Sequence, residues 1–275
     1  MHHVGKVAET SARDGIYDRH SREHRRLPLI GPATGSPHQE IAVVELDPGG
    51  GVDAHLHAFE QGLYLLEGEA ALAVAGTEER LGADDFVWIE AGVAHSVSNA
   101  GSGSTRWLEV GAPGPVDGLD DTVFASAGAE VEVPYRRGHF DESQLPAPSD
   151  TIGLEGFGAA NVGGASLTML VDRDFGASQF NLFVVQYAPG GLIKEHDHPF
   201  EEAFFFVRGE IEAVLDGETH ALGAGGYCWS GVGSMHTFVN RSDQPVRWLE
   251  TQAPQPPSRH QARFRGDWER LVKQE

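Results

Sequence analysis

The chain has 275 residues and a formal net charge of −21 at pH 7, with 40% hydrophobic residues, 35 glycines and one cysteine, Cys228. The negative charge opposes binding to nucleic acids and to anionic membranes, and a lone cysteine excludes an internal disulfide. No apolar run approaches the roughly 20 residues that span a bilayer, and residues 1–15 lack a signal-peptide core. We therefore expect a cytoplasmic protein whose partner is a small molecule.

Residues 1–38 form a polar stretch that glycine and proline interrupt. The charged run Arg22–Arg26 indicates a solvated arm, which covers either a sheet edge or a partner subunit. The histidines of this stretch show no ligand spacing and are interpreted as surface residues: His2, His3, His20 and His24.

Strand-like segments begin at Glu40 and lead into an internal repeat. Sliding the sequence by 141 residues superposes Pro48–Pro113 on Pro189–Pro254 without a gap, with 23 identical residues over 66 positions. A chance similarity would not keep one ungapped alignment over that length. Many short segments separated by turns favour β-structure, so the chain is predicted to be all-β, with two copies of one domain.

The repeat predicts the organisation of the chain. Its segments are an N-terminal arm (1–38), a first domain (39–114), a connector (115–150), a second domain (151–258) and a C-terminal tail (259–275). The connector contains one predicted strand, AEVEVPY, and is expected to cross the surface and to lend strands to the second domain. The tail is expected to form a short helix from Asp267, with a lysine near its C-terminal end that suits the helix dipole.

The second copy contains a set of metal-ligand residues. His196 and His198 are two apart, so a strand presents both imidazoles on one face. Glu202 follows a Pro–Phe break, from which a new strand can return its carboxylate to the same point, and His236 can complete the set from across a sheet. Three imidazoles and a carboxylate suit a first-row divalent metal, with Mn or Fe expected first and Zn, Ni or Co as alternatives.

This spacing resembles the two motifs of the cupin superfamily. The first is matched by Gly190 or Gly191, His196, His198, Glu202 and Gly209, and the second by Gly225, Gly231, Gly233, His236 and Asn240, with Gly231 in place of the family's proline. With the repeat, the chain resembles a bicupin over most of residues 40–113 and 180–254. The resemblance implies two tandem double-stranded β-helix (jelly-roll) barrels, and at the family level a homodimer.

The first copy differs at the carboxylate position. The corresponding set in the first copy is His55, His57, Gln61 and His95, with Gln61 at the carboxylate position. Three imidazoles can bind a divalent ion, but the amide oxygen of Gln61 is uncharged and a weaker ligand. The site of the first copy is therefore predicted to hold metal less tightly than the main site in the second copy, or to hold none. Glu60 has the wrong parity for the ligand face, which favours a supporting or surface role.

The residues around the main set suggest a substrate pocket. Phe204 and Phe206 share the strand parity of Glu202, and Phe238 shares that of His236. These rings either line a cavity for a partly apolar substrate or are ordinary barrel core. Two arginines that are identical in both copies, Arg106 and Arg247, are predicted to serve the fold in ion pairs with Glu109 and Glu250.

Three functions fit these features. The first is an Fe- or Mn-dependent dioxygenase-type enzyme with its active metal in the C-terminal barrel, since such a metal keeps open positions for substrate and O2; bicupins of similar ligation include quercetin dioxygenases and oxalate decarboxylases. Glu202 is the one candidate base, if it leaves the metal.

The second function is a non-redox enzyme, because HLHAFEQGLYLLEG resembles the metal segment of ureidoglycine aminohydrolase, a manganese bicupin hydrolase. Isomerases and cyclases also occur among cupins. The third is a non-enzymatic storage or small-molecule-binding bicupin.

Overall fold

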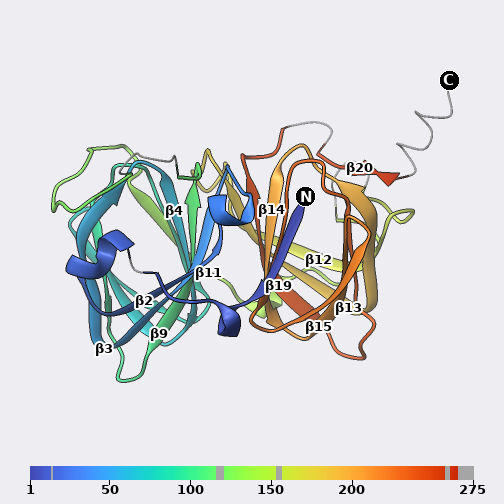
Figure 1. Ribbon diagram of the computed structural model, residues 1–275, viewed down its shortest axis with the longest axis horizontal. Helices are drawn as coiled ribbons and strands as arrows, with labels where there is room; N and C mark the ends of the chain where they lie inside the picture. The colour runs from blue at the N-terminus through green and yellow to red at the C-terminus, as the bar shows by residue number, and fades with distance from the viewer. Residues whose placement is uncertain (14, 116–120, 153–156, 258–260, 266–275) are drawn as a thin grey trace. The chain divides into compact units, whose positions relative to one another are not determined.

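The computed structural model describes the chain except residues 14, 116–120, 153–156, 258–260 and 266–275. The chain divides into two compact units, each built on one curled antiparallel sheet (Figure 1). The first barrel unit comprises Glu9–Asp141 and Leu170–Phe180, and the second barrel unit comprises Met1–Ala8, Glu142–Met169 and Asn181–Glu275. The prediction of two tandem jelly-roll barrels is confirmed.

Ten strands of the described residues make the sheet of the first barrel unit. They are β2 (Ser21–Ile30), β3 (Glu40–His57), β4 (Glu60–Glu67), β5 (Glu69–Val74), β6 (Thr77–Gly82), β7 (Asp85–Ile89), β8 (His95–Asn99), β9 (Thr105–Ala112), β10 (Thr122–Val123) and β11 (Tyr135–His139). Their hydrogen-bonded order is β11-β7-β4-β9-β3-β8-β5-β6, and β2 and β10 also pair with β3.

The second barrel unit repeats this order within its described part. Its strands are β1 (His2–Lys6), β12 (Val162–Val171), β13 (Asn181–Asp197), β14 (Glu201–Arg208), β15 (Glu210–Leu215), β16 (Glu218–Gly223), β17 (Gly226–Ser230), β18 (His236–Val239), β19 (Val246–Ala253) and β20 (Arg263–Phe264). The order is β1-β17-β14-β19-β13-β18-β15-β16, and β12 and β20 also pair with β13.

Apart from the single helical residue Arg265, helical structure in the described part of the chain consists of short 3₁₀ turns. These are η1 (Val7–Glu9), η2 (Gly15–Arg19), η3 (Pro32–Thr34) and η4 (Glu142–Gln144). The helix predicted from Asp267 lies outside the described residues. Where the structure describes the chain, no helix has the length and apolar character needed to cross a membrane.

Each barrel is filled by the inward-facing residues of its strands. In the first barrel, the buried cluster consists of aliphatic side chains around Trp107. In the second, the equivalent Trp248 lies among phenylalanine rings, including Phe183 and Phe206. Residues alternate between the two faces of a strand, and on the central strands the second face is buried as well, for example at Tyr64 and Phe205.

Two segments outside the repeat supply edge strands. The N-terminal arm covers sheet edges, one of its two predicted roles: β1 pairs with β17 over five residues, and β2 pairs with β3. The connector was expected to lend strands to the second barrel, and its strand β11 instead pairs with β7 of the first. The strand predicted over AEVEVPY is also wrong except at its last residue, because β11 is Tyr135–His139. The pairing of such a segment depends on tertiary structure.

Candidate metal centres

The four residues predicted for the main site come together inside the second barrel. His196 lies near the end of β13, His198 directly follows that strand, Glu202 lies on β14 and His236 begins β18. All four are buried. The Oε2 atom of Glu202 lies 3.3 Å from Nε2 of His198 and 3.1 Å from Nε2 of His236, and the rings of His196 and His236 are 4.4 Å apart.

Backbone carbonyls fix the orientation of these imidazoles. Nδ1 of His196 lies 2.6 Å from the carbonyl of Lys194, Nδ1 of His236 lies 3.1 Å from that of Ser234, and Nδ1 of His198 contacts the carbonyl of Gln261. A carbonyl only accepts hydrogen bonds, so each Nδ1 carries the proton and each Nε2 keeps its lone pair. This is the tautomer that a metal requires.

The electrostatics of the second barrel favour an ionised Glu202. Burial alone would raise the pKa of Glu202, but His198 and the other imidazoles lower it well below the usual range. Burial lowers the pKa of His196 and of His198. For His236, burial acts in the same direction, but the neighbouring Glu202 carboxylate, 3.1 Å from its Nε2, outweighs it, so its pKa is raised.

The first barrel brings its own predicted set together in the same way. His55 and His57 lie on β3, Gln61 on β4 and His95 on β8, and all are buried. Nδ1 of His55 donates to the carbonyl of Asp53 at 2.7 Å, and Nδ1 of His95 donates to that of Val93 at 3.0 Å. In each barrel, the ligand atoms of the three histidines lie within 4.8 Å of one another.

Thr122 on β10 orients the remaining imidazole of the first barrel. Its Oγ1 lies 2.9 Å from Nδ1 of His57 and donates its own hydrogen to Asp121. Nδ1 of His57 is therefore the donor, and Nε2 keeps its lone pair. Burial lowers the pKa of all three histidines, that of His95 to about 3, so these imidazoles remain neutral near pH 7.

Several buried lone pairs of the two sets have no hydrogen-bond partner. These atoms are Nε2 of His57, Nε2 of His95, Oε1 of Gln61 and Oε2 of Glu202. Unpaired buried acceptors cost free energy, and acceptors directed at a common point are what a cation needs. The residues present therefore fit a divalent metal in both barrels, with a carboxylate oxygen in the second and an amide oxygen in the first.

A neighbouring polar side chain orients the fourth ligand of each set. In the first barrel, Nε2 of Gln61 donates to Oε2 of Glu109 at 3.2 Å, which leaves the amide oxygen facing the imidazoles. In the second, Nε2 of Gln252 donates to Oε1 of Glu202 at 2.9 Å, which leaves Oε2 for the metal. Glu109 and Gln252 were not predicted as site residues.

The predicted partners of Arg106 and Arg247 are wrong. Arg106 pairs with Glu45 at 3.0 Å, and Arg247 pairs with Glu142 at 2.7 Å. An arginine and a glutamate three positions apart on one strand lie on opposite faces, so Glu109 cannot meet Arg106. Glu109 follows the buried Trp107 by two residues, so both side chains lie on the same face of the strand. This spacing was the sequence signal that Glu109 points inward.

Glu250 is the inward-facing counterpart of Glu109 in the second barrel. Nε1 of Trp248 donates to its Oε2 at 2.8 Å. Burial, and then the charge of Glu202, raise the pKa of Glu250 well above the usual range. The raised pKa favours the neutral form of Glu250, which does not repel the Glu202 carboxylate.

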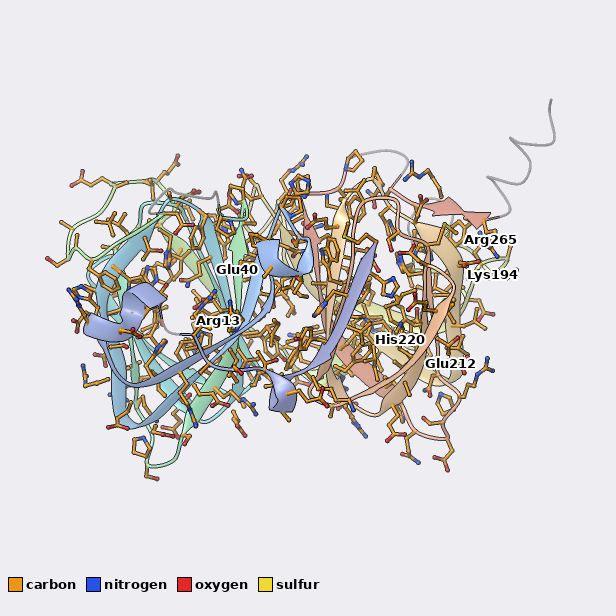
Figure 2. All side chains as sticks on the ribbon, in the orientation of Figure 1. Arg13, Glu40, Lys194, Glu212, His220 and Arg265 are labelled. Atoms are coloured by element: carbon orange, nitrogen blue, oxygen red, sulfur yellow. The ribbon has the colours of Figure 1, made fainter. Side chains whose placement is uncertain are left out.

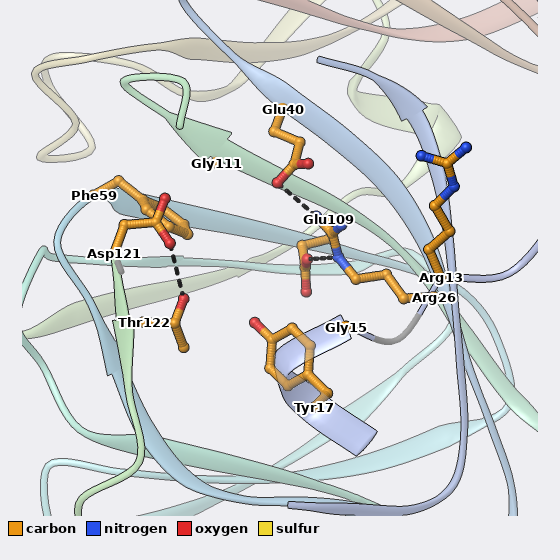
Figure 3. Close-up of a pocket in the computed structure, with 10 residues that line it drawn as sticks. All are labelled: Arg13, Gly15, Tyr17, Arg26, Glu40, Phe59, Glu109, Gly111, Asp121 and Thr122. Carbon is orange, nitrogen blue, oxygen red and sulfur yellow. Dashed lines mark hydrogen bonds and ion pairs between the residues drawn. The ribbon is translucent and has the colours of Figure 1, made fainter. Parts of the chain in front are cut away.

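A cavity of about 170 Å³ lies beside the metal set of the first barrel (Figure 3). Its lining residues are Arg13, Gly15, Tyr17, Arg26, Glu40, Phe59, Glu109, Gly111, Asp121 and Thr122. Arg26 donates to Glu109 at 2.9 Å and to Glu40 at 3.0 Å, and the Tyr17 ring faces His55 edge-on at 5.7 Å. Burial raises the pKa of Tyr17, so it presents a neutral phenol.

Aromatic rings surround the metal set of the second barrel. Phe204 and Phe238 lie 5.8 and 6.1 Å from the ring of His236, whereas Phe206 packs against Phe238 and Trp248. All three belong to the buried core. Phe204 and Phe238 therefore border the metal set, and Phe206 lies one layer deeper. Their role as a substrate pocket remains a prediction.

A short strand pairs with the end of the strand that contains the first histidines in each barrel. β10 pairs with Leu56 and His57, and β20 pairs with His196 and Asp197. Each brings a phenylalanine to the first histidine of its set: Phe124 lies 5.7 Å from His55, and Phe264 lies 5.3 Å from His196. Both strands fall outside the repeat, so the sequence comparison of the two copies missed them.

Comparison with known proteins agrees with this geometry. The family model of the cupin domain matches residues 42–111 and 183–251, which together make up half of the chain. The chain therefore belongs to the cupin family, with one cupin domain in each barrel.

Two curated relatives come from polyketide pathways, by their names. The chain is 34% identical over 102 residues to polyketide synthase CurC of Streptomyces cyaneus, covering 36% of this chain and 66% of that protein. It is 30% identical over 102 residues to the tetracenomycin polyketide synthase protein TcmJ of Streptomyces glaucescens, covering 36% and 68%. The chain thus spans about two thirds of the length of these relatives.

The similar solved structures include oxalate decarboxylases. The Bacillus subtilis enzyme superposes with a TM-score of 0.69 and 15% identity, over 98% of this chain and 81% of the other. The Lactobacillus farciminis enzyme gives 0.68 and 16%, over 99% and 92%. At this identity, the likeness shows the bicupin fold.

Proposed function

We propose that this chain is a metal-dependent bicupin enzyme of the Fe or Mn dioxygenase type, with its active metal in the second barrel. The observation that carries the proposal is the convergence of three Nε2 lone pairs and an ionised carboxylate on one buried point. His196, His198, His236 and Glu202 would hold the metal. Manganese is supported by a similar structure, since the Bacillus subtilis oxalate decarboxylase has Mn(II) centres.

The residues of this chain do the positioning in the proposed reaction. When bound, a divalent metal polarises a coordinated oxygen of the substrate and lowers its pKa. Phe204 and Phe238 exclude water from the neighbouring space and favour an apolar or aromatic substrate. Glu202 is the candidate proton acceptor, because it is the ionised group in contact with two imidazoles.

The curated relatives support an aromatic or enolic substrate. Both are named as polyketide synthase proteins, and polyketide intermediates carry enols, phenols and ketones that can donate an oxygen to a metal. We propose a small metabolite of this class as the substrate.

The cavity of the first barrel supports a second candidate function, a non-redox reaction such as hydrolysis, cyclisation or isomerisation. Tyr17, Arg26 and Glu109 give this cavity a phenol, a guanidinium and a carboxylate, which are groups that orient a substrate and transfer protons. Here His55, His57, His95 and Gln61 would hold the metal.

The test is metal content per chain, followed by O2 uptake with enol and catechol substrates. The protein is purified untagged and without chelator, and His198→Ala is compared with the matched variant His57→Ala. One Fe or Mn per chain, lost together with O2 uptake in His198→Ala and kept in His57→Ala, is the expected result.

Other outcomes separate the alternatives. Turnover without O2 consumption that is lost in His57→Ala would replace the proposal with the non-redox candidate. Equal loss of activity in both variants would contradict the choice of the second barrel. Failure of both barrels to retain a metal after reloading would indicate a binding protein.

A further inference from the structure

A third group of metal-ligand side chains lies outside both barrel interiors. His2 on β1 meets Glu218 and His220 on β16, and their ligand atoms lie within 4.8 Å of one another. Nε2 of His2 is 3.7 Å from Oε2 of Glu218, and the rings of His2 and His220 are 5.5 Å apart. His2 was expected at the surface because it shows no ligand spacing, and its neighbours here lie more than 200 residues away in sequence.

This group bridges the seam of the second barrel. In the strand order of the second unit, β1 is at one end and β16 is at the other, so a contact between them closes the curled sheet. Glu218 and His220 are two apart on β16 and therefore share one face. Figure 2 labels His220 on the second unit.

The first barrel closes its equivalent seam with direct hydrogen bonds. There, Tyr135 on β11 occupies the register position of His2, because Tyr135 pairs with Ile89 and His2 pairs with the equivalent Ser230. The phenol of Tyr135 donates to Glu79 at 2.6 Å and contacts Oγ1 of Thr77 at 2.9 Å. Direct hydrogen bonds thus satisfy the polar groups of that seam.

The second barrel has side chains that can bind a metal at the three equivalent positions. The repeat aligns Glu218 with Thr77 and His220 with Glu79. Among the described residues, Nε2 of His220 is buried and has no hydrogen-bond partner, so the residues of this seam do not satisfy one another. In the tautomer that is protonated on Nδ1, this nitrogen offers a lone pair to a divalent cation.

Asp216 orients His2 toward this point. Nδ1 of His2 lies 3.2 Å from Oδ2 of Asp216, which turns Nε2 toward Glu218. Asp216 is itself held in the β15–β16 turn, where it accepts from Oγ of Ser234 at 2.9 Å and from the backbone N–H of Met235 at 3.0 Å. A carboxylate behind a histidine ligand is a common feature of metal sites, where it fixes the ring and its tautomer.

We propose that His2, Glu218 and His220 form a zinc-class metal site that fastens strand β1 to β16 and closes the second barrel. Two imidazole nitrogens and one carboxylate oxygen suit Zn²⁺, with water in the remaining position. Asp216 acts as a positioning residue. The site is separate from the buried sets of both barrels and does not depend on the proposed catalytic function.

The test compares zinc binding by the full-length, untagged protein with two single variants. His220→Ala removes a ligand, whereas His3→Ala is the matched control, because His3 is on the same strand but faces Tyr227. Equilibrium dialysis with Zn²⁺ counts bound ions per chain. Hydrogen exchange followed by mass spectrometry, with and without Zn²⁺, measures protection of residues 2–6.

The expected result is one zinc per chain fewer in His220→Ala than in the wild type and in His3→Ala. Zinc should slow exchange of β1 in the wild type and in His3→Ala, but not in His220→Ala. At about 100-fold excess over Kd, zinc should also raise the Tm of the second barrel by roughly 5–10 °C. Asp216→Asn should weaken this site by roughly 10–100-fold without removing it.

Two results would overturn the proposal. The first is an equal zinc count in the wild type and His220→Ala, since all bound zinc would then belong to the barrel interiors. The second is a count that falls in His220→Ala with no zinc-dependent protection of β1 in the wild type, because the ion would then not join the two strands.

Discussion

The two barrels use opposite pairs of residues for one task, which is to direct a single oxygen at three imidazoles. In the first barrel the oxygen beside the imidazoles belongs to an amide, Gln61, and its orienting partner is a carboxylate, Glu109. In the second, the oxygen belongs to a carboxylate, Glu202, and the partner is an amide, Gln252. The negative charge is therefore beside the imidazoles in the second barrel and one side chain away in the first. This difference supports tighter metal binding in the second barrel.

Burial of neutral histidines predicts acid sensitivity of the metal-free first barrel. Burial lowers the pKa of His95 to about 3, whereas an unfolded histidine titrates near 6.5. Between these values, the unfolded state binds more protons than the folded state, so stability falls as the pH is lowered through this window. The loss for one such histidine is at most about 1.4 kcal/mol per pH unit.

Urea unfolding of chelator-treated protein at several pH values between 7.5 and 4 checks this expectation. His95→Gln should flatten the fall in stability of the first barrel. His236 has a raised pKa, so it contributes stability that is present below pH 6.5 and lost as the pH rises through its folded pKa. His236→Gln should therefore remove stability at low pH, and the same pH slope in both variants would refute the assignment.

At the scale of single residues, the sequence predicted which histidines converge but not the groups that orient them. A histidine spacing and a repeat were sufficient to bring together His55, His57 and His95, and likewise their counterparts. Thr122 and the carbonyl of Gln261, which orient His57 and His198, come from segments outside the repeat. No local pattern connects such residues to a site, because tertiary structure alone brings them there.

At the scale of elements, the segment Leu170–Phe180 is joined to the first barrel by one buried carboxylate. Glu60 accepts hydrogen bonds from Nε1 of Trp88 at 3.1 Å, from the N–H and Oγ of Ser178 at 3.0 and 2.6 Å, and from the N–H of Gln179 at 3.2 Å. Gly176 has a φ of 117°, and a Cβ there would lie 2.9 Å from the Trp88 ring. The segment therefore needs both this glycine and this acceptor.

Glu60→Ala should destabilise the first barrel by about 3 kcal/mol, because it leaves several buried donors without an acceptor. Glu60→Gln keeps one acceptor oxygen and should cost less. Urea unfolding, followed with hydrogen exchange of residues 170–180, measures both effects. A change below about 0.5 kcal/mol in Glu60→Ala would show that this contact does not hold the segment.

The edge strands also show the limit of sequence-based prediction at this scale. The repeat predicted the strands that both barrels share, since the same residues recur at the same spacing. Strands β1, β11 and β20 lie outside the repeat, are short, and pair with partners far away in sequence. A short strand pattern carries no information about which sheet edge it will cover, so the connector was expected to serve the wrong barrel.

At the scale of the whole molecule, the two units exchange chain segments. Met1–Ala8 belongs to the second unit, although the residues that follow it belong to the first, and Leu170–Phe180 belongs to the first, although it lies between two parts of the second. The boundaries of the repeat are therefore not the boundaries of the folded units. A chain cut between its two copies would separate each barrel from a strand or segment that completes it.

Deletion of residues 1–8 should loosen the second barrel while leaving the first intact. The deletion exposes the edge of β17, where Cys228 pairs with Val4, and an uncovered edge opens and self-associates more readily. Cys228 is buried, and burial raises its pKa well above the usual range, so its thiol reacts only when the strand opens. A loss of one or two kcal/mol in local stability makes labelling by a thiol reagent roughly 5–30-fold faster.

The control variant His3→Ala keeps the strand and should label at the wild-type rate. An unchanged rate in the deletion variant would mean that β1 does not protect this edge in solution, and the proposed zinc site would then lack the strand it is expected to fasten.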